Sequence, residues 1–186
     1  MHFKEHSILV GRHAFLSPSN YHWTNYDADK LREVYLNNQA AKRGTRLHQL
    51  AHELIELGVR LPKGGKTLNQ YVNDGIGYRM TTEQALVYSD NCFGHADTIS
   101  FSRQLLRIHD LKTGLIPGNM RQLEVYAALF CLEYGYKPGE IEMELRIYQS
   151  DEVLVVQNPV DNVAHIMSKI VTFDGYIEKL KAEAGG

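Results

Sequence analysis

Residues 93–134 decide the fold, and they contain three segments of different pattern: FGHADTISFS (93–102), QLLRIHDLKT (104–113) and NMRQLEVYAALFCLEY (119–134). The first two have the composition of β-strands, and the connection near residue 103 is short enough for an antiparallel pair. The third has helical spacing and is followed by Gly135, a residue that commonly ends helices. This region therefore predicts two antiparallel strands followed by a helix.

The flanking sequence extends the sheet and adds helices. A preceding strand is predicted at EQALVYS (83–89). Apolar and polar residues alternate with period two in EIEMELRIYQS (140–150), which predicts another strand, and its expected hairpin partner is EVLVVQN (152–158). Helices are expected at 26–39, 41–57 and 160–182, whereas 1–25 is expected to be irregular and the polar stretch 59–82 to be a flexible surface loop. Gly58 should end helix 41–57, and that helix is expected to bury a leucine stripe: Leu47, Leu50, Leu54 and Leu57.

This element order predicts a mixed α/β (or α+β) fold in which one domain, residues 1–186, is built around a central sheet. Its expected parts are an N-terminal helical region (1–58), the sheet with its helix (83–159) and a C-terminal helix (160–186).

The composition excludes several classes of protein. Hydrophobic residues make up 44% of the 186, and 20 Lys+Arg against 22 Asp+Glu give a net charge of −2. This excludes disordered and collagen-like chains, and a protein of this charge can bind nucleic acid only through a local patch or with metal ions. Two cysteines, Cys92 and Cys131, are too few for a cysteine-based zinc or iron–sulfur site. The sequence has neither a membrane span nor a signal peptide, so we expect a cytoplasmic protein.

The segment HDLKTG suggests phosphoryl chemistry. On a strand, Asp110 and Lys112 lie on the same face about 6–7 Å apart, where the carboxylate can hold a divalent cation and the ammonium can stabilise a phosphate. The alternative is a surface ion pair at a strand end. Asp97 lies on the preceding strand, and pairing through the turn near 103 brings it toward Asp110. Two adjacent carboxylates favour Mg²⁺ or Mn²⁺ between them, and Gly94 permits a bulge or a close backbone approach.

Three further side chains fit such a site, each with a simpler alternative. Gln122 and Tyr126 share one helix face, although a tyrosine in this segment is often a core residue. His48 lies in an apolar-striped helix, where a histidine is often only structural. His48 and His52 lack the glutamate of zinc-peptidase motifs. His95 and His109 flank the two aspartates, as supporting or incidental residues.

Four features of the sequence, taken in order, resemble the PD-(D/E)XK nuclease superfamily, and within it the RecB-like exonuclease branch found in phage and bacterial recombination enzymes. These features are His48, GHAD (94–97), IHDLKTG (108–114) and QLEVYAALF (122–130). The resemblance covers residues 17–134 and extends to LSPSNYHW (16–23) and AAKRGTRLH (40–48). It implies a restriction-endonuclease-like αβββαβ core with a central mixed sheet flanked by helices.

The resemblance also implies roles for individual residues. One or two Mg²⁺ or Mn²⁺ ions would be held by His48, Asp97, Asp110 and the main-chain carbonyl of Leu111. Lys112 would contact the scissile phosphate and the attacking water. Gln122 and Tyr126 would border the active site and help to place the DNA strand. Some relatives carry an iron–sulfur cluster on four cysteines, which this chain cannot do.

The function implied is that of a phage-encoded DNA exonuclease that processes ends for recombination or repair, acting in the bacterial host cytoplasm. A structure-selective or restriction-type endonuclease is the nearest alternative, and a catalytically silent nuclease fold that binds DNA or protein is another. Besides DNA, a single-strand annealing or recombination protein is an expected partner, and the oligomeric state stays open. The candidate DNA-binding cations, which are equally explained as solvated side chains, are Lys42, Arg43, Arg46, Lys63 and Lys66.

Overall fold

The computed structural model describes residues 14–184, and the chain divides into two compact units, 1–43 and 44–186. The described part of the first unit contains the 3-10 helix η2 (Pro18–Asn25) and the first half of helix α1 (Ala28–Glu56). In η2, the Trp23 indole donates a hydrogen bond to the carbonyl oxygen of Ser17 at 3.0 Å. Residues 14–25 are therefore more regular than predicted, and the rest of the expected irregular segment lies outside the described residues.

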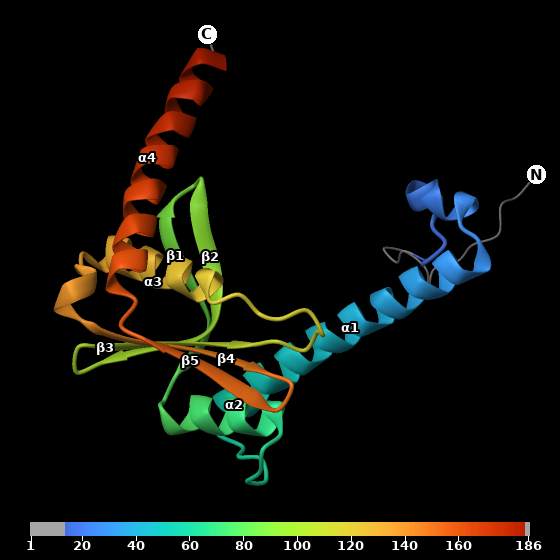
Figure 1. The fold of residues 1–186 in the computed structure, drawn as a ribbon, viewed down its shortest axis with the longest axis horizontal. Helices are drawn as coiled ribbons and strands as arrows, with labels where there is room; N and C mark the ends of the chain where they lie inside the picture. The colour runs from blue at the N-terminus through green and yellow to red at the C-terminus, as the bar shows by residue number, and fades with distance from the viewer. Residues whose placement is uncertain (1–13, 185–186) are drawn as a thin grey trace, which may run out of the picture. The chain divides into compact units, whose positions relative to one another are not determined.

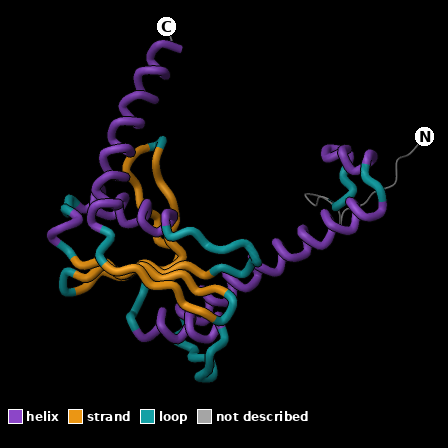
Figure 2. The backbone as a smooth tube through the Cα atoms, viewed as in Figure 1, coloured by secondary structure: helices purple, strands orange, loops and turns teal. Residues whose placement is uncertain are grey.

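The second unit is built on a five-stranded sheet in the order β1-β2-β3-β4-β5 (Figures 1 and 2). The strands are β1 (Thr81–Ser89), β2 (Cys92–Ser102), β3 (Leu105–Leu111), β4 (Glu142–Gln149) and β5 (Glu152–Gln157). Neighbouring strands are antiparallel except β3 and β4, which are parallel. A parallel pair needs a crossover connection, and helix α3 (Arg121–Tyr134) with the short η3 (Pro138–Glu140) supplies it.

Helices cover both faces of this sheet. Helix α3 and the start of helix α4 (Val160–Ala184) enclose the larger core, together with the strand residues Leu86, Leu106, Ile108, Met143 and Leu145. The end of α1 and helix α2 (Thr67–Gly77) form a smaller core with Leu111 and Tyr148. The mixed α/β class and the five predicted strands are thus confirmed. No helix among residues 14–184 combines the length and the apolar character needed to cross a membrane.

Two predictions about helices are wrong. The helices expected at 26–39 and 41–57 form the single helix α1, because nothing between them prevents a helical backbone. The polar stretch 59–82 contains α2, which the sequence pattern missed. Helix α2 buries Tyr71 and Val72 against the sheet, and its first residue is bonded by Asp151, 84 positions away in the chain. Tertiary contacts of this kind override weak local propensity.

The buried face of α1 also differs from the predicted leucine stripe. Leu50 and Leu57 are 42% and 75% exposed, and the buried residues are Gly44, Ala51 and Ile55. Small residues face the protein because the helix packs closely there: a Cβ on Gly44 would lie 2.7 Å from the Thr113 hydroxyl oxygen. This rotation puts His48 beside the buried face. The expected end at Gly58 is confirmed, since its φ is +67° and its N–H bonds the carbonyl of Ile55.

Candidate active site

The register of the sheet brings the two predicted aspartates together. The β2–β3 ladder has its last bonded pair at Thr98 and His109. The next residue along each strand is an aspartate, so Asp97 and Asp110 lie just beyond the last pair, and the charge of Asp97 acts on the Asp110 carboxyl. The close backbone approach predicted at Gly94 is confirmed, because a Cβ there would lie 2.9 Å from the ring of Tyr126. Two carboxylates therefore meet at the end of the β2–β3 ladder.

Asp110 is the buried member of this pair. Its side chain is 4% exposed, and its Oδ2 makes no bond of hydrogen-bonding geometry, although the Lys112 ammonium lies 2.9 Å away. Burial raises the pKa of the Asp110 carboxyl, and the negative charge of Asp97 adds to this, while Lys112 opposes it. A buried carboxylate beside a second carboxylate is stabilised by positive charge.

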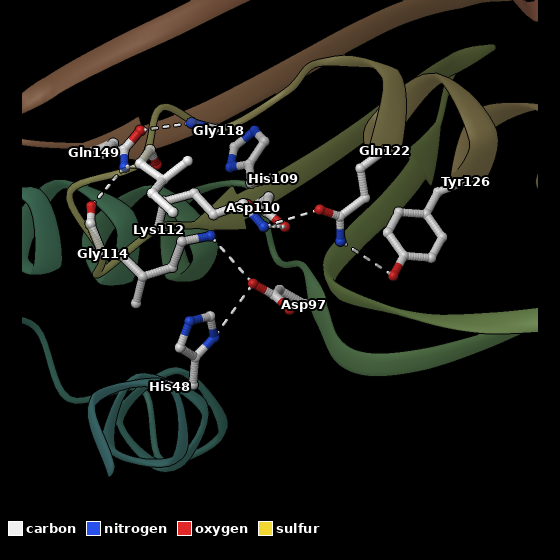
Figure 3. Close-up of polar contacts among 12 residues, drawn as sticks. His48, Asp97, His109, Asp110, Lys112, Gly114, Gly118, Gln122, Tyr126 and Gln149 are labelled. Atoms are coloured by element: carbon white, nitrogen blue, oxygen red, sulfur yellow. Dashed lines mark hydrogen bonds and ion pairs between the residues drawn. The ribbon is translucent and has the colours of Figure 1, made fainter. Parts of the chain in front are cut away.

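Lys112 supplies that charge and is held from two sides. Its ammonium donates to Asp110 Oδ1 at 3.1 Å and to the side-chain oxygen of Gln122 at 2.9 Å. The Gln122 amide lies 3.5 Å from the Tyr126 hydroxyl, a long contact along α3. Figure 3 shows the lysine between the strand carboxylates and these two helix residues. Lys112 follows the last residue of β3, so a strand, a loop and a helix meet at its ammonium group.

His48 and Leu111 complete the site on the Asp97 side. The His48 Nδ1 lies 3.4 Å from Asp97 Oδ2, and the Leu111 N–H donates to the same oxygen at 3.1 Å. The hydrogen bond to Asp97 raises the pKa of His48, against the lowering effect of burial. In Figure 3 the His48 ring extends from α1 toward Asp97. All seven predicted site residues therefore belong to one connected cluster: His48, Asp97, Asp110, Leu111, Lys112, Gln122 and Tyr126.

The donor chemistry of this cluster suits a hard divalent cation. Two carboxylates and an imidazole are available, and the buried Asp110 Oδ2 has unused acceptor capacity. Within residues 14–184, however, no three His, Cys, Asp or Glu side chains are already arranged as a metal-holding group. Lys112 and His48 instead contact the two carboxylates directly. The metal-ligand roles of His48, Asp97, Asp110 and the Leu111 carbonyl remain predictions.

The predicted DNA-binding cations are solvent-exposed side chains or form a surface ion pair. Arg43, Arg46 and Lys63 are exposed. Lys66 pairs with Asp151 at 2.9 Å, at the beginning of α2. His52, considered above with His48, contacts the Thr82 hydroxyl, and that hydroxyl donates to Glu56. His95 is exposed, in keeping with an incidental residue.

A buried polar network on the opposite face of β3 was missed by the sequence analysis. His109 is fully buried, and its Nδ1 lies 3.2 Å from the Tyr148 hydroxyl, which donates to Asp74 at 2.6 Å. Arg146 bonds both Asp74 and the Tyr78 hydroxyl. Burial lowers the pKa of His109 to about 3, and the nearby Arg146 adds to this. The available signal was Arg146, the one cation in the predicted strand 140–150.

Gln149 is a second residue that no motif indicated. Its side-chain nitrogen donates to the carbonyls of Gly114 and Ile116 at 2.7 and 2.8 Å, and its oxygen accepts from the Gly118 N–H at 2.8 Å. One side chain at the end of β4 thus holds the loop between Lys112 and α3 (Figure 3).

We expect Gly94→Ala to destabilise the protein by about 1–2 kcal/mol, because the added methyl group forces the Tyr126 ring to move. Urea unfolding of the variant and the wild type measures this difference. The matched control is Gly64→Ala, where a Cβ meets nothing within 4 Å. Equal unfolding midpoints for the two variants would show that the approach of Gly94 to Tyr126 is not tight.

Comparisons with protein-family models and with curated protein sequences find no match to this chain. The assignment of function therefore depends on the chemistry of the seven-residue cluster.

Proposed function

We propose that this chain is a metal-dependent deoxyribonuclease that hydrolyses DNA phosphodiester bonds, and that it acts as an exonuclease on DNA ends during recombination or repair. The observation that carries the proposal is the contact of the Lys112 ammonium with the buried Asp110 carboxylate, opposite Asp97 and beside His48. Carboxylate oxygens that can bind a cation therefore lie next to an ammonium group that can bind a phosphate.

Each residue has a part in this chemistry. Asp97, Asp110 and His48 would hold Mg²⁺ or Mn²⁺, with the Leu111 carbonyl as a further ligand, and such an ion polarises a phosphate and lowers the pKa of a bound water. The Lys112 ammonium would stabilise the negative charge that develops on the phosphate. Gln122 orients Lys112 through the 2.9 Å hydrogen bond, and Tyr126 lies behind Gln122 on the helix.

The fold supports the same class of enzyme. The helix–strand–strand–strand–helix–strand order of α2, β1, β2, β3, α3 and β4 has the αβββαβ sequence expected of a PD-(D/E)XK nuclease core. The sheet is mixed, and both carboxylates lie where β2 and β3 stop pairing. We therefore place the chain in that superfamily as part of the proposal, with the RecB-like branch as the basis for exonuclease action.

Two tests on the purified chain decide this function. With Mg²⁺ or Mn²⁺ we expect end-labelled linear DNA to be degraded, closed circular single- and double-stranded DNA to stay intact, and EDTA to stop the reaction. Degradation of circles would indicate the endonuclease alternative. Absence of hydrolysis on every substrate with either metal would indicate a silent nuclease fold and contradict the proposal.

A further inference from the structure

The loop between β3 and α3 leaves Lys112 and comes back to it at Gly118. A Cβ on Gly118 would lie 3.0 Å from Lys112 Cγ and 2.9 Å from Ile147 Cγ2, so the Gly118 backbone packs against the alkyl part of the lysine side chain. The Lys112 N–H donates to the carbonyl oxygen of Tyr148 at 2.9 Å. Both ends of this loop therefore lie beside Lys112, at the end of β4, in the manner of a compact surface loop with adjoining ends.

Burial of apolar side chains does little to hold this loop. Leu115 is 97% exposed and Ile116 is 86% exposed. Between the loop and the β4–β5 hairpin lies a hollow of about 370 Å³, whose lining includes Ile147, Gln149 and Leu154. A loop with few buried apolar contacts is among the least stable parts of a protein unless hydrogen bonds hold it. The position of this loop therefore depends on its hydrogen bonds.

Gln149 supplies these hydrogen bonds with both ends of its side-chain amide. The nitrogen donates to the carbonyls of Gly114 and Ile116 at 2.7 and 2.8 Å, and the oxygen accepts from the Gly118 N–H at 2.8 Å (Figure 3). A glutamate cannot make the two donations, because an ionised carboxylate only accepts. One side chain thus fixes the beginning, the middle and the end of the loop.

The loop also connects the two side chains that meet at the ammonium group. Lys112 precedes the loop, and Gln122 follows it on the first turn of α3. The ammonium donates to Gln122 at 2.9 Å and to Asp110 at 3.1 Å. A lysine side chain has many rotamers, and its contact with Gly118 restricts them. Displacement of either end of the loop would therefore change where the ammonium lies.

We propose that Gln149 is a positioning residue for Lys112: by holding Gly118 against the alkyl chain of the lysine, it keeps the ammonium group between Asp110 and Gln122. This inference rests on the proposed nuclease function. Gln149 acts through Lys112, since the three hydrogen bonds of its amide go to the loop. A displacement of about 1 Å in a catalytic group can cost about 100-fold in rate, so a loosened loop should measurably slow hydrolysis.

The first test compares the full-length wild type with Gln149→Met, which keeps the length of the side chain and removes its hydrogen bonds. On end-labelled linear duplex DNA with saturating Mg²⁺, we expect kcat to fall about tenfold. KM should stay within about twofold, because the variant weakens an interaction made in the transition state rather than DNA binding. The matched control is Gln70→Met: Gln70 also holds a loop, through a 2.7 Å hydrogen bond to the Gly65 carbonyl, and both constants should stay at wild-type values.

The second test asks whether the effect passes through the lysine. Gln149→Met is combined with Lys112→Met, and single-turnover rates are measured with enzyme in excess. If Gln149 acts by positioning Lys112, its substitution should change the residual rate of Lys112→Met by less than about twofold. A general structural role would instead slow both backgrounds by the same factor.

A third measurement follows the loop itself, without reference to activity. The Gly118 amide should exchange its hydrogen about tenfold faster in Gln149→Met than in the wild type, because its acceptor is gone. The Lys112 amide, which is bonded to Tyr148, should keep its exchange rate and so report that the end of β4 is intact. Unchanged exchange at Gly118 would contradict the support of the loop by Gln149.

The remaining outcomes separate this role from the enzyme. A wild-type kcat for Gln149→Met would contradict the positioning role and leave the nuclease in place. A rise in KM alone would contradict it as well, because the loop would then act in binding DNA. Equal losses with and without the lysine would also contradict it. Failure of the wild type on every substrate with either metal would contradict the proposed function, and with it any role of Gln149 in hydrolysis.

Discussion

Lys112→Met is expected to reduce DNA hydrolysis by about 10²–10³-fold, because it removes the ammonium group that stabilises the phosphate in the proposed mechanism while keeping the length of the side chain. The lysine bridges Asp110 and Gln122 in the structure, and Met can bond neither. The initial rate on end-labelled linear DNA with saturating Mg²⁺ measures the loss. Asp110→Asn, which keeps the shape of the side chain but not its charge, is expected to be at least as inactive.

The matched control is Lys137→Met. Lys137 forms an ion pair with Glu140 at 3.1 Å, similar in length to the Lys112 pair, but it is 81% exposed and lies beyond α3. It should retain the wild-type rate. Urea unfolding of each variant checks that the fold is intact. If Lys112→Met stays within about tenfold of the wild type while EDTA abolishes activity, the charge-stabilising role of Lys112 is wrong.

Arg146→Leu is expected to lower the free energy of unfolding by about 3 kcal/mol, because its guanidinium is partly buried and pairs with two carboxylates. Its guanidinium lies 3.0 Å from Asp74 and 3.1 Å from Glu144, and it is 18% exposed. The leucine leaves Asp74 with the Tyr148 hydroxyl as its remaining partner in the network. Loss of one member of a partly buried ion pair leaves the other charge uncompensated.

Urea unfolding of Arg146→Leu, with Lys137→Met again as the exposed ion-pair control, measures this effect. Exposed pairs contribute about 0–1 kcal/mol, so the control should be nearly neutral. Because Arg146 joins β4 to α2, the variant should also expose backbone amides of α2 to faster hydrogen exchange. A loss of less than about 1 kcal/mol would mean that the network contributes little to stability.

Much of the site could be predicted from the sequence because its residues lie on a few continuous segments. Asp97 and Asp110 fall on consecutive strands joined by a short turn, and Lys112 directly follows the second strand, so their proximity follows from the hairpin and from sequence neighbourhood. Gln122 and Tyr126 follow from helical spacing. His48 was proposed from its place in a motif order, and its 3.4 Å approach to Asp97 depends on how α1 is rotated. The leucine pattern of α1 predicted that rotation incorrectly.

The rest depended on contacts between segments distant in the chain. Helix α2 has a polar sequence, and it is stabilised by Asp151 from the β4–β5 turn and by the burial of Tyr71 and Val72. The Gln149 hydrogen bonds to the loop at 114–118 span more than 30 residues. Such partners carry no periodicity and no motif, because a single polar side chain has the same local sequence signature whether it faces solvent or a neighbouring loop.

By itself, the sequence determined the class of fold, the five strands and the order of the carboxylate and lysine positions, since period, turn length and residue type act over a few neighbouring residues. Tertiary structure alone decided which face of α1 is buried, that residues 67–77 form a helix, and that Leu115 and Ile116 stand on a supported loop. Those outcomes depend on the free energy of packing and hydrogen bonding between remote segments, which no local pattern records.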